Sequence, residues 1–335
     1  MSFDSSAANS VDDFLARRFL FVTGKGGVGK TTVVAVLAER FARAGKRVLI
    51  AETSPKEHLS TLFGRGSLPT QITELMPRVF GVLLDANVAL KEYGALVLKS
   101  ERLVGALFDN KLVNGFFHGA PGLKEWALLG KAWYHSTETL ADGSPRFDVV
   151  ILDAPATGHG LDMLRVPKTI IELSPPGVLR TDAEKAWTQF RDPQKSGVVV
   201  VSLPEEMPTN ESIELCAALE NELGLPLLSL IVNQVVPSVF SPAERDALAA
   251  VEEPLGTDAA AQALGAGIRR AAREQVQAAS LERLGSLGAP MLELPFLSAG
   301  VHDARAIASL SAALSAQGQD AAAAWSKNQT PPSAS

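Results

Sequence analysis

The chain has 335 residues, of which 46% are hydrophobic, so it can bury a large core. Its net charge of −6 and isoelectric point near 5.5 argue against the basic surface of a nucleic-acid-binding protein, and we expect no nucleic-acid partner. The single cysteine, Cys216, excludes an intramolecular disulfide and a metal site built from cysteine pairs, and we expect it to be a small buried side chain.

Residues 1–16 are predicted to form an N-terminal extension of the folded domain. They contain no basic segment followed by an apolar one, so they do not resemble a secretory signal. No apolar stretch elsewhere approaches the roughly 18 residues that would span a bilayer. These features predict a cytoplasmic protein without stable membrane insertion.

The first predicted strand, loop and helix form a phosphate-binding unit. A short apolar run at 18–23 is followed by G-K-G-G-V-G-K-T-T, and residues 31–44 have the composition of a helix that ends at Gly45. In a G-x-x-x-x-G-K-T loop, glycines expose backbone N–H groups to phosphate oxygens, Lys30 supplies a positive charge and Thr31 can bind Mg²⁺. The sequence therefore predicts that ATP is bound by Gly24, Lys25, Gly26, Gly27, Val28, Gly29, Lys30, Thr31 and Thr32.

Further short apolar runs alternate with longer helical stretches. Runs that are apolar on both faces fit strands buried within a parallel sheet. The alternation predicts an α/β fold with a doubly wound, mostly parallel sheet and helices on both faces, in which the ligand lies beyond the carboxyl ends of the strands. The predicted strands after the first lie at 47–52, 79–85, 147–153, 198–202, 227–233 and 290–294.

One P-loop ATPase domain is predicted over residues 17–316. Residues 86–145 contain no convincing strand and are predicted to be a helical insertion between two core strands. Residues 317–335 are rich in glutamine, serine and proline, and they are predicted to form a disordered tail.

Asp153 ends one predicted strand and begins the segment D-A-P-A-T-G-H at 153–159. A carboxylate at a strand end near a phosphate loop can hold Mg²⁺, usually through water, so Thr31 and Asp153 are the predicted metal ligands. Two alternatives stay open. Asp153 could simply cap the strand end, and His159 is as readily a loop histidine with satisfied hydrogen bonds as a phosphate contact.

Three features together resemble the arsenite-pump ATPase family, whose P-loop carries a deviant Walker A sequence. They are the extra lysine Lys25, the Asp-x-x-x-Thr-Gly-His segment followed by L-R-V-P, and I-V-N-Q at 231–234 with Leu294-Pro295 later in the chain. The similarity runs from about residue 17 to about residue 315. The best-known eukaryotic branch of this family guides tail-anchored membrane proteins to the endoplasmic reticulum, and this chain looks like a member of the bacterial branch.

The resemblance implies a dimer whose subunits face each other across paired nucleotides. Lys25 would then reach the partner's phosphates and neutralise charge on the transferred phosphoryl group, as an arginine finger does. Asn233 would contact adenine, with Pro295 and Phe296 near the base. The alternatives are that Lys25 is a solvated loop cation and that Asn233 only forms a turn at a strand end.

One position departs from the family pattern. The family usually places an aspartate that positions the attacking water just before a proline after the second strand, whereas here Ser54 precedes Pro55. Serine cannot act as a carboxylate base at neutral pH, and Glu52, which points to the same side of the strand, is the nearest replacement. Because losing a well-placed base costs on the order of 10²–10⁴ in rate, we predict slow ATP hydrolysis. The predicted catalytic residues are Lys25, Lys30 and Glu52, and the alternative is that Glu52 has no catalytic role.

Apolar residues between 96 and 133 recur at spacings of three to four, as in amphipathic helices. In the resembled family, helices in this region form a groove for an apolar client helix, although ordinary core packing explains the pattern equally well. Arsenite capture needs several cysteines as soft ligands, and the zinc clasp of the eukaryotic branch needs paired cysteines, so Cys216 alone supports neither.

We therefore predict a dimeric switch that depends on ATP and Mg²⁺ and couples nucleotide state to a hydrophobic protein client. It would be a homodimer, or a heterodimer with a paralogue that supplies the missing aspartate. One alternative is a non-hydrolysing, nucleotide-dependent scaffold. Another is an ATPase of the septum- or plasmid-positioning kind, although those proteins need a membrane-binding helix or a basic DNA surface.

Overall fold

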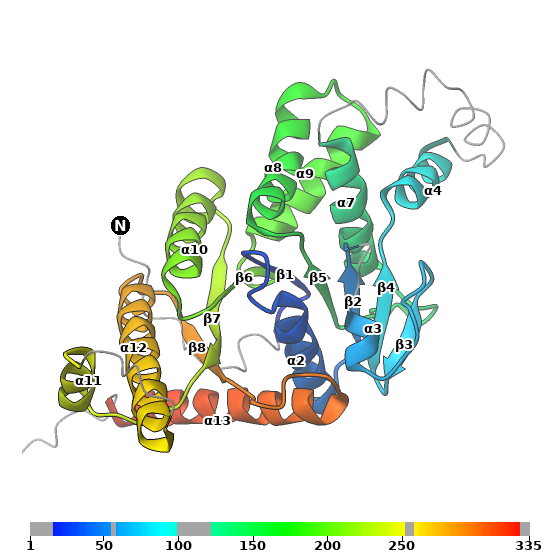
Figure 1. The fold of residues 1–335 in the computed structure, drawn as a ribbon. Helices are drawn as coiled ribbons and strands as arrows, with labels where there is room; N and C mark the ends of the chain where they lie inside the picture. The colour runs from blue at the N-terminus through cyan, green and yellow to red at the C-terminus, as the bar shows by residue number, and fades with distance from the viewer. Residues whose placement is uncertain (1–15, 55–57, 99–121, 252–257, 329–335) are drawn as a thin grey trace, which may run out of the picture.

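The computed structural model describes residues 16–54, 58–98, 122–251 and 258–328 (Figure 1). They form an eight-stranded sheet with the order β3-β4-β2-β5-β1-β6-β7-β8, in which every pairing except that of β3 with β4 is parallel. The strands are β1 (Phe19–Gly24), β2 (Val48–Glu52), β3 (Thr73–Met76), β4 (Val79–Leu83), β5 (Val149–Asp153), β6 (Ser196–Ser202), β7 (Leu227–Val235) and β8 (Met291–Pro295).

Every strand predicted from an apolar run is present, but the sequence prediction missed β3. This strand pairs antiparallel with β4 at the edge of the sheet and buries only Leu75, so its four residues do not form an apolar run. A tight turn joins β3 to β4, and Arg78 adopts a positive φ of 69° there. A short edge strand of this kind gives no periodic signal, because one buried side chain suffices to hold it.

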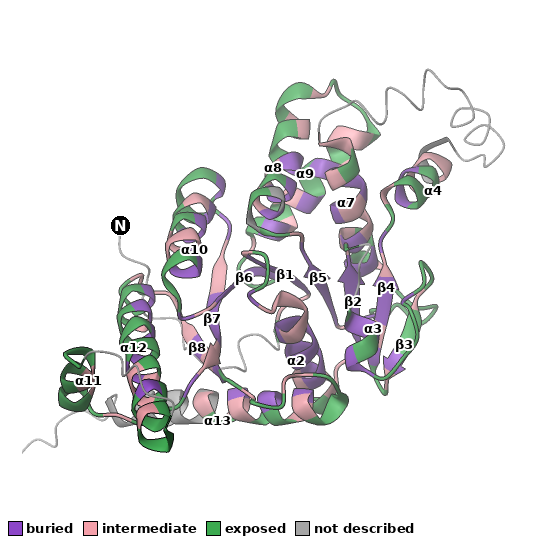
Figure 2. Cartoon of the chain, in the orientation of Figure 1, coloured by how far each residue is buried: buried purple, intermediate pink, exposed green. Residues whose placement is uncertain are grey.

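Helices cover both faces of the sheet, as predicted (Figure 1). Their bounds are α2 (Lys30–Arg43), α3 (Leu59–Leu62), α4 (Ala86–Leu98), α7 (Leu123–Thr137), α8 (Thr157–Leu173), α9 (Val178–Arg191), α10 (Glu206–Ala218), α11 (Pro242–Ala249), α12 (Ala259–Gly285) and α13 (Ala304–Asn328), with a π-helical turn at Leu219–Leu223. Figure 2 shows the contrast in burial between the strands and α2, which are largely buried, and α11, which is exposed. Within the described ranges, no helix is long and apolar enough to cross a membrane.

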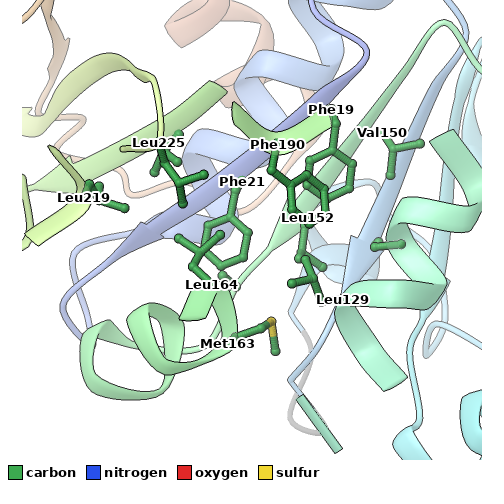
Figure 3. Close-up of a cluster of buried hydrophobic side chains, with 14 of the residues drawn as sticks. Phe19, Phe21, Leu129, Val150, Leu152, Met163, Leu164, Phe190, Leu219 and Leu225 are labelled. Atoms are coloured by element: carbon green, nitrogen blue, oxygen red, sulfur yellow. The ribbon is translucent and has the colours of Figure 1, made fainter. Parts of the chain in front are cut away.

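The alternation of side chains along β1 divides the core into two clusters. Leu20 and Val22 face α2 and α13, whereas Phe19 and Phe21 face α7, α8, α9 and α10. Figure 3 shows the second cluster, in which the rings of Phe19 and Phe190 lie 5.0 Å apart between centroids. Because both faces of β1 are buried, this strand occupies the centre of the sheet and presents its carboxyl end, the phosphate loop, between the two helical layers.

Two segments differ in part from their predicted structure. Helices α4 and α7 lie within the predicted insertion at 86–145, but its last part, residues 138–145, is not helical and contains the isolated antiparallel bridge between Thr139 and Pro145. Residues 99–121, which include much of the apolar pattern, lie outside the described residues. Helix α13 runs to Asn328, so it extends into the segment that the sequence predicted to be a disordered tail from residue 317. At that boundary the Gln317 side chain bonds to the backbone N–H and carbonyl of Glu293, which ties α13 to β8.

Candidate nucleotide site

Two glycines fix the path of the phosphate loop. Gly24 has a φ of 148°, and a Cβ there would lie 2.2 Å from the backbone oxygen of Val201 on β6. Gly29 has a φ of 88°, and a Cβ there would lie 2.3 Å from the side-chain nitrogen of Asn233 on β7. Any larger residue at either position would push the loop off its neighbouring strands.

The remainder of the loop has the arrangement that phosphate binding requires. Helix α2 begins at Lys30, so the positive end of its dipole points into the loop. Its first turn contains no acidic residue that would offset this positive potential. Val28 is fully buried and anchors the loop in the core, whereas Gly26 and Gly27 are exposed. Thr32 is half-buried behind them.

Lys30 lies inside the loop. Its Nζ donates hydrogen bonds to the carbonyl oxygens of Gly24 and Lys25, at 3.1 and 3.0 Å. Burial lowers the pKa of Lys30, while the negative charges of Asp153 and Glu52 act in the opposite direction. The ammonium group is therefore held next to the space that the loop encloses, with two acidic side chains nearby.

Thr31 and Asp153, the predicted metal ligands, are in direct contact. The Thr31 hydroxyl donates to Asp153 Oδ2 at 2.6 Å. Burial is the main cause that raises the pKa of Asp153, and hydrogen bonds with Thr31 and Glu52 and the charge of Lys30 oppose it. In the described part of the chain, no group of three or more histidine, cysteine or acidic side chains could hold a metal ion. A hydroxyl and one buried carboxylate suit Mg²⁺, which usually completes its shell with water and phosphate oxygens.

Glu52 lies beside this pair because β2 and β5 are neighbouring parallel strands, and Glu52 is the register partner of Asp153. Its side chain is buried, and its Oε1 accepts a hydrogen bond from the backbone N–H of Ser54 at 2.7 Å. The Thr53 hydroxyl donates to the Asp153 carbonyl at 2.7 Å. Ser54 therefore orients Glu52 through its backbone, and the carboxylate at this edge of the site comes from Glu52.

Lys25 points to a residue that the sequence did not single out. Its Nζ lies 2.6 Å from Oε1 of Glu211 on α10, and the two side chains are 26% and 33% exposed. Glu211 stands in a run of polar residues far along the chain from the loop, so no spacing could have indicated this ion pair. In the structure, Lys25 is therefore paired with an acidic side chain at a partly exposed position.

Asn233 joins the far side of the site to the loop. Its Nδ2 donates to the Val28 carbonyl at 3.0 Å, and its Oδ1 accepts from the Gln234 N–H at 2.9 Å. Pro295 and Phe296 lie nearby at the end of β8, where the Phe296 N–H donates to the Val235 carbonyl at 2.8 Å. The structure thus brings the predicted base-contacting residues to the same sheet edge as the loop, and the Asn233 amide holds the loop in place.

Residues 17–173 match the model of the family described as anion-transporting ATPase. The chain belongs to this family of P-loop ATPases. The matched region contains the loop, Glu52 and Asp153, so the family model covers the phosphate end of the site.

Several individual ATPases are similar to this chain over longer stretches. The ATPase BagA of Mycobacterium tuberculosis is 29% identical over 328 residues, which cover 90% of this chain and 93% of that protein. The arsenical pump-driving ATPase of Acidiphilium multivorum is 30% identical over 250 residues, which cover 69% of this chain and 41% of the pump ATPase. ATPase ARSA1 of Chlamydomonas reinhardtii is 29% identical over 275 residues, with 66% and 35% covered. The chain therefore spans less than half of the last two proteins.

Proposed function

We propose that this ATPase is a dimeric switch that hydrolyses ATP slowly and couples its nucleotide state to the binding of an apolar protein segment. The observation that carries the proposal is the group formed by Lys30, Thr31, Asp153 and Glu52 at one edge of the sheet. The loop would bind the phosphates through its backbone N–H groups and Lys30, while Thr31 and Asp153 would hold Mg²⁺. Mg²⁺, when bound, neutralises negative charge on the phosphate oxygens.

Glu52 is the residue that we assign to the attacking water. It is the carboxylate nearest to the position where the family usually carries aspartate, and the N–H of Ser54 holds its Oε1. From there it would accept a hydrogen bond from water and orient it toward the γ-phosphate. Glu52 is also the register partner of Asp153, so the carboxylate assigned to the water stands next to the proposed metal ligand.

Lys25 carries the proposal of a dimer. Lys30 already supplies a cation to the phosphates of its own subunit, so a second lysine in the same loop is redundant within one subunit. We assign Lys25 to the phosphates of the partner subunit, where it would stabilise charge on the transferred group. Its ion pair with Glu211 is partly exposed, and pairs of that kind contribute about 0–1 kcal/mol, so an incoming phosphate can displace the carboxylate.

The proposed client site is a pocket of about 420 Å³ between α4, α7 and α9, which we call the α7 pocket. Its lining is largely apolar and aromatic, and Lys131 and Glu92 form an ion pair beside it. Large apolar side chains on its walls are partly exposed, including Val178 at 52% and Tyr134 at 40%. The main lining residues are Leu90, Tyr93, Trp126, Trp133, Tyr134 and Val178.

A short path connects the phosphate end of the site to the α7 pocket. Helix α8 begins at Thr157, just after Asp153 and its following loop. The start of α7 rests on α8, because a Cβ on Gly122 would lie 3.3 Å from the side chain of Val166. A change in α8 upon nucleotide binding would therefore move α7, which forms one wall of the pocket.

The relatives named for arsenical pumps suggest a different cargo, which Cys216 does not favour. Its side chain is buried on α10, and burial raises the pKa of its thiol to about 12, so it is protonated and inaccessible. Soft-metal capture by this subunit would need further thiols, and the chain has none. We therefore prefer a protein client over arsenite.

ATP turnover per mole of protein, measured over a range of protein concentrations, tests the switch. A dimeric mechanism predicts that specific activity rises with concentration to a plateau, and a constant specific activity would contradict it. Tight ATP binding without turnover would favour the non-hydrolysing scaffold, for which the serine at position 54 is the supporting observation. Turnover restored by a second ATPase subunit would favour a heterodimer.

A further inference from the structure

The last side chain of β1 before the phosphate loop belongs to Thr23, and it is fully buried. Alternation along the strand places it on the same face as Phe19 and Phe21, which pack against α7, α8, α9 and α10 (Figure 3). Among the described residues, the Thr23 hydroxyl has no hydrogen-bond partner. Such buried hydroxyls are rare, because they give up the hydrogen bonds that water would provide.

The first turn of α8 lies directly against this hydroxyl. A Cβ on Gly160 would lie 2.6 Å from Thr23 Oγ1 and 2.9 Å from the carbonyl oxygen of Pro155, and both distances are shorter than a side-chain carbon tolerates. Only glycine at position 160 therefore lets α8 approach β1 this closely. The Thr23 hydroxyl and the beginning of α8 share one small space in the core.

The amino-terminal end of α8 has no side-chain cap. Ala156 occupies the cap position, and its methyl group cannot accept a hydrogen bond. The first N–H groups of a helix have no carbonyl partner within the helix. In α8 the Gly160 N–H bonds to the Ala156 carbonyl at 3.1 Å, so the groups without a helical partner are those of residues 157–159. Helix α8 therefore offers donors, and Thr23 an acceptor, at the place where the two elements touch.

Thr23 also stands where the parts of the proposed nucleotide site meet. The residue after it opens the phosphate loop. The residue before it, Val22, accepts at its carbonyl from the N–H of Ala154 at 3.1 Å, and Ala154 follows Asp153. Because α8 begins soon after Asp153, a displacement of Asp153 toward a bound nucleotide moves the first turn of α8 relative to Thr23.

We propose that Thr23 is a positioning residue, whose hydroxyl accepts a hydrogen bond from the first turn of α8 when nucleotide is bound. This bond supplies the cap that Ala156 cannot supply, and it fixes α8 against the strand that carries the phosphate loop. The inference rests on the proposed nucleotide site and adds a residue outside the phosphate, metal and base contacts expected from the sequence.

The test combines two measurements on variants of Thr23. Binding of AMP-PNP, an ATP analogue that is not hydrolysed, is measured by calorimetry with Mg²⁺, and thermal unfolding is measured without nucleotide. Thr23→Val keeps the shape and removes the hydroxyl, whereas Thr23→Ser keeps the hydroxyl. Thr209→Val is the matched control, since Thr209 on α10 is also fully buried and its hydroxyl has no partner in the described part of the chain.

We expect Thr23→Val to bind AMP-PNP roughly three- to tenfold more weakly, which is the effect of losing one hydrogen bond. Without nucleotide it should unfold at the same temperature as the unmodified protein or higher, because the buried hydroxyl gives up no bond there. Thr23→Ser and Thr209→Val should keep the affinity of the unmodified protein.

Several outcomes would overturn the proposal. Unchanged AMP-PNP affinity in Thr23→Val would remove Thr23 from the switch, and an equal loss in Thr23→Ser would show that the hydroxyl is not the group that matters. An equal loss in Thr209→Val would make the effect a general one of buried hydroxyls. A lower unfolding temperature of Thr23→Val without nucleotide would give the hydroxyl a purely structural role. Failure of the unmodified protein to bind AMP-PNP would instead refute the proposed nucleotide site, on which this role depends.

Discussion

At the phosphate end of the site, the contacts are polar and short, and they come from the loop or from adjacent strand ends. Lys30 bonds to two carbonyls of its own loop, and Thr31 bonds to Asp153 at 2.6 Å. The α7 pocket, in contrast, is lined by apolar side chains from three helices. The phosphate end therefore depends on the positions of single atoms, whereas the α7 pocket depends on shape and apolar area. Substitutions in the two regions should therefore affect different measurements.

The largest expected effect comes from Lys25→Ala. If this lysine acts across a dimer, turnover should fall on the order of 10³-fold or more, as when an arginine finger is removed, while ATP affinity changes little because Lys30 and the loop remain. Lys91→Ala, an exposed lysine on α4, is the control. Unchanged turnover in Lys25→Ala would refute the role across the dimer and leave Lys25 as the partner of Glu211.

Glu52→Gln should reduce turnover by roughly 10²–10⁴-fold with nucleotide binding retained, because the amide cannot accept a proton from water. Ser54→Asp in the Glu52→Gln background should recover part of the rate by restoring the family's usual carboxylate. Single-turnover ATPase measurements separate chemistry from product release. Equal rates in the unmodified protein and Glu52→Gln would return Glu52 to a structural role beside Asp153.

Asp153 predicts a pH dependence at the phosphate end. Burial raises its pKa. At a pH between the ordinary carboxyl pKa and the raised value, the folded chain therefore holds a proton that the unfolded chain lacks. The stability of the fold falls as the pH rises through that window. Mg²⁺ competes with the same proton. Nucleotide affinity with Mg²⁺ should therefore increase with pH by at most about tenfold per unit.

The measurement for Asp153 is ADP affinity against pH, with Mg²⁺ and with EDTA. Asp153→Asn should lose the Mg²⁺-dependent slope, and it should stabilise the nucleotide-free protein because the buried charge is gone. An identical slope in EDTA would place the titrating group elsewhere.

The smallest effect on chemistry should come from the α7 pocket. Val178→Asp places a charge on its wall and should weaken binding of a synthetic apolar helix several-fold, with turnover and stability nearly unchanged because Val178 is 52% exposed. Leu173→Asp is the matched control, since Leu173 is 79% exposed and does not line the pocket. Equal binding by both variants would remove the pocket from client recognition.

Predictability from sequence follows the same division. The loop and its flanking strand and helix were predicted because each residue type has a local reason, such as the positive φ of Gly24 and Gly29. β3 was missed because one buried side chain is too little to produce a pattern. The sequence prediction ended the folded domain at residue 316, because the composition beyond it suggested disorder. Helix α13 continues past that point, and Gln317 bonds to the backbone of β8.

Long-range polar contacts could not be read from the chain at all. The ion pair of Lys25 with Glu211 and the cation–π contact of Arg273 with Phe296 each join residues that are far apart in the sequence. Neither Glu211 nor Arg273 stands in a motif. In the sequence, each looks like any charged residue on the solvated face of a helix. The bond from Asn233 to the Val28 carbonyl likewise depends on β7 lying two strands from the loop.

The family, the parallel α/β fold and the phosphate-binding loop could be predicted from the sequence alone, because glycine spacing, buried β-branched runs and helix signals are local properties. The side chains that stand next to the loop depend on the tertiary structure. It placed Glu52 beside Asp153 through the register of β2 and β5, gave Lys25 a partner on α10, and formed the α7 pocket between helices. Register and helix packing arise from contacts between distant segments, which no local pattern records.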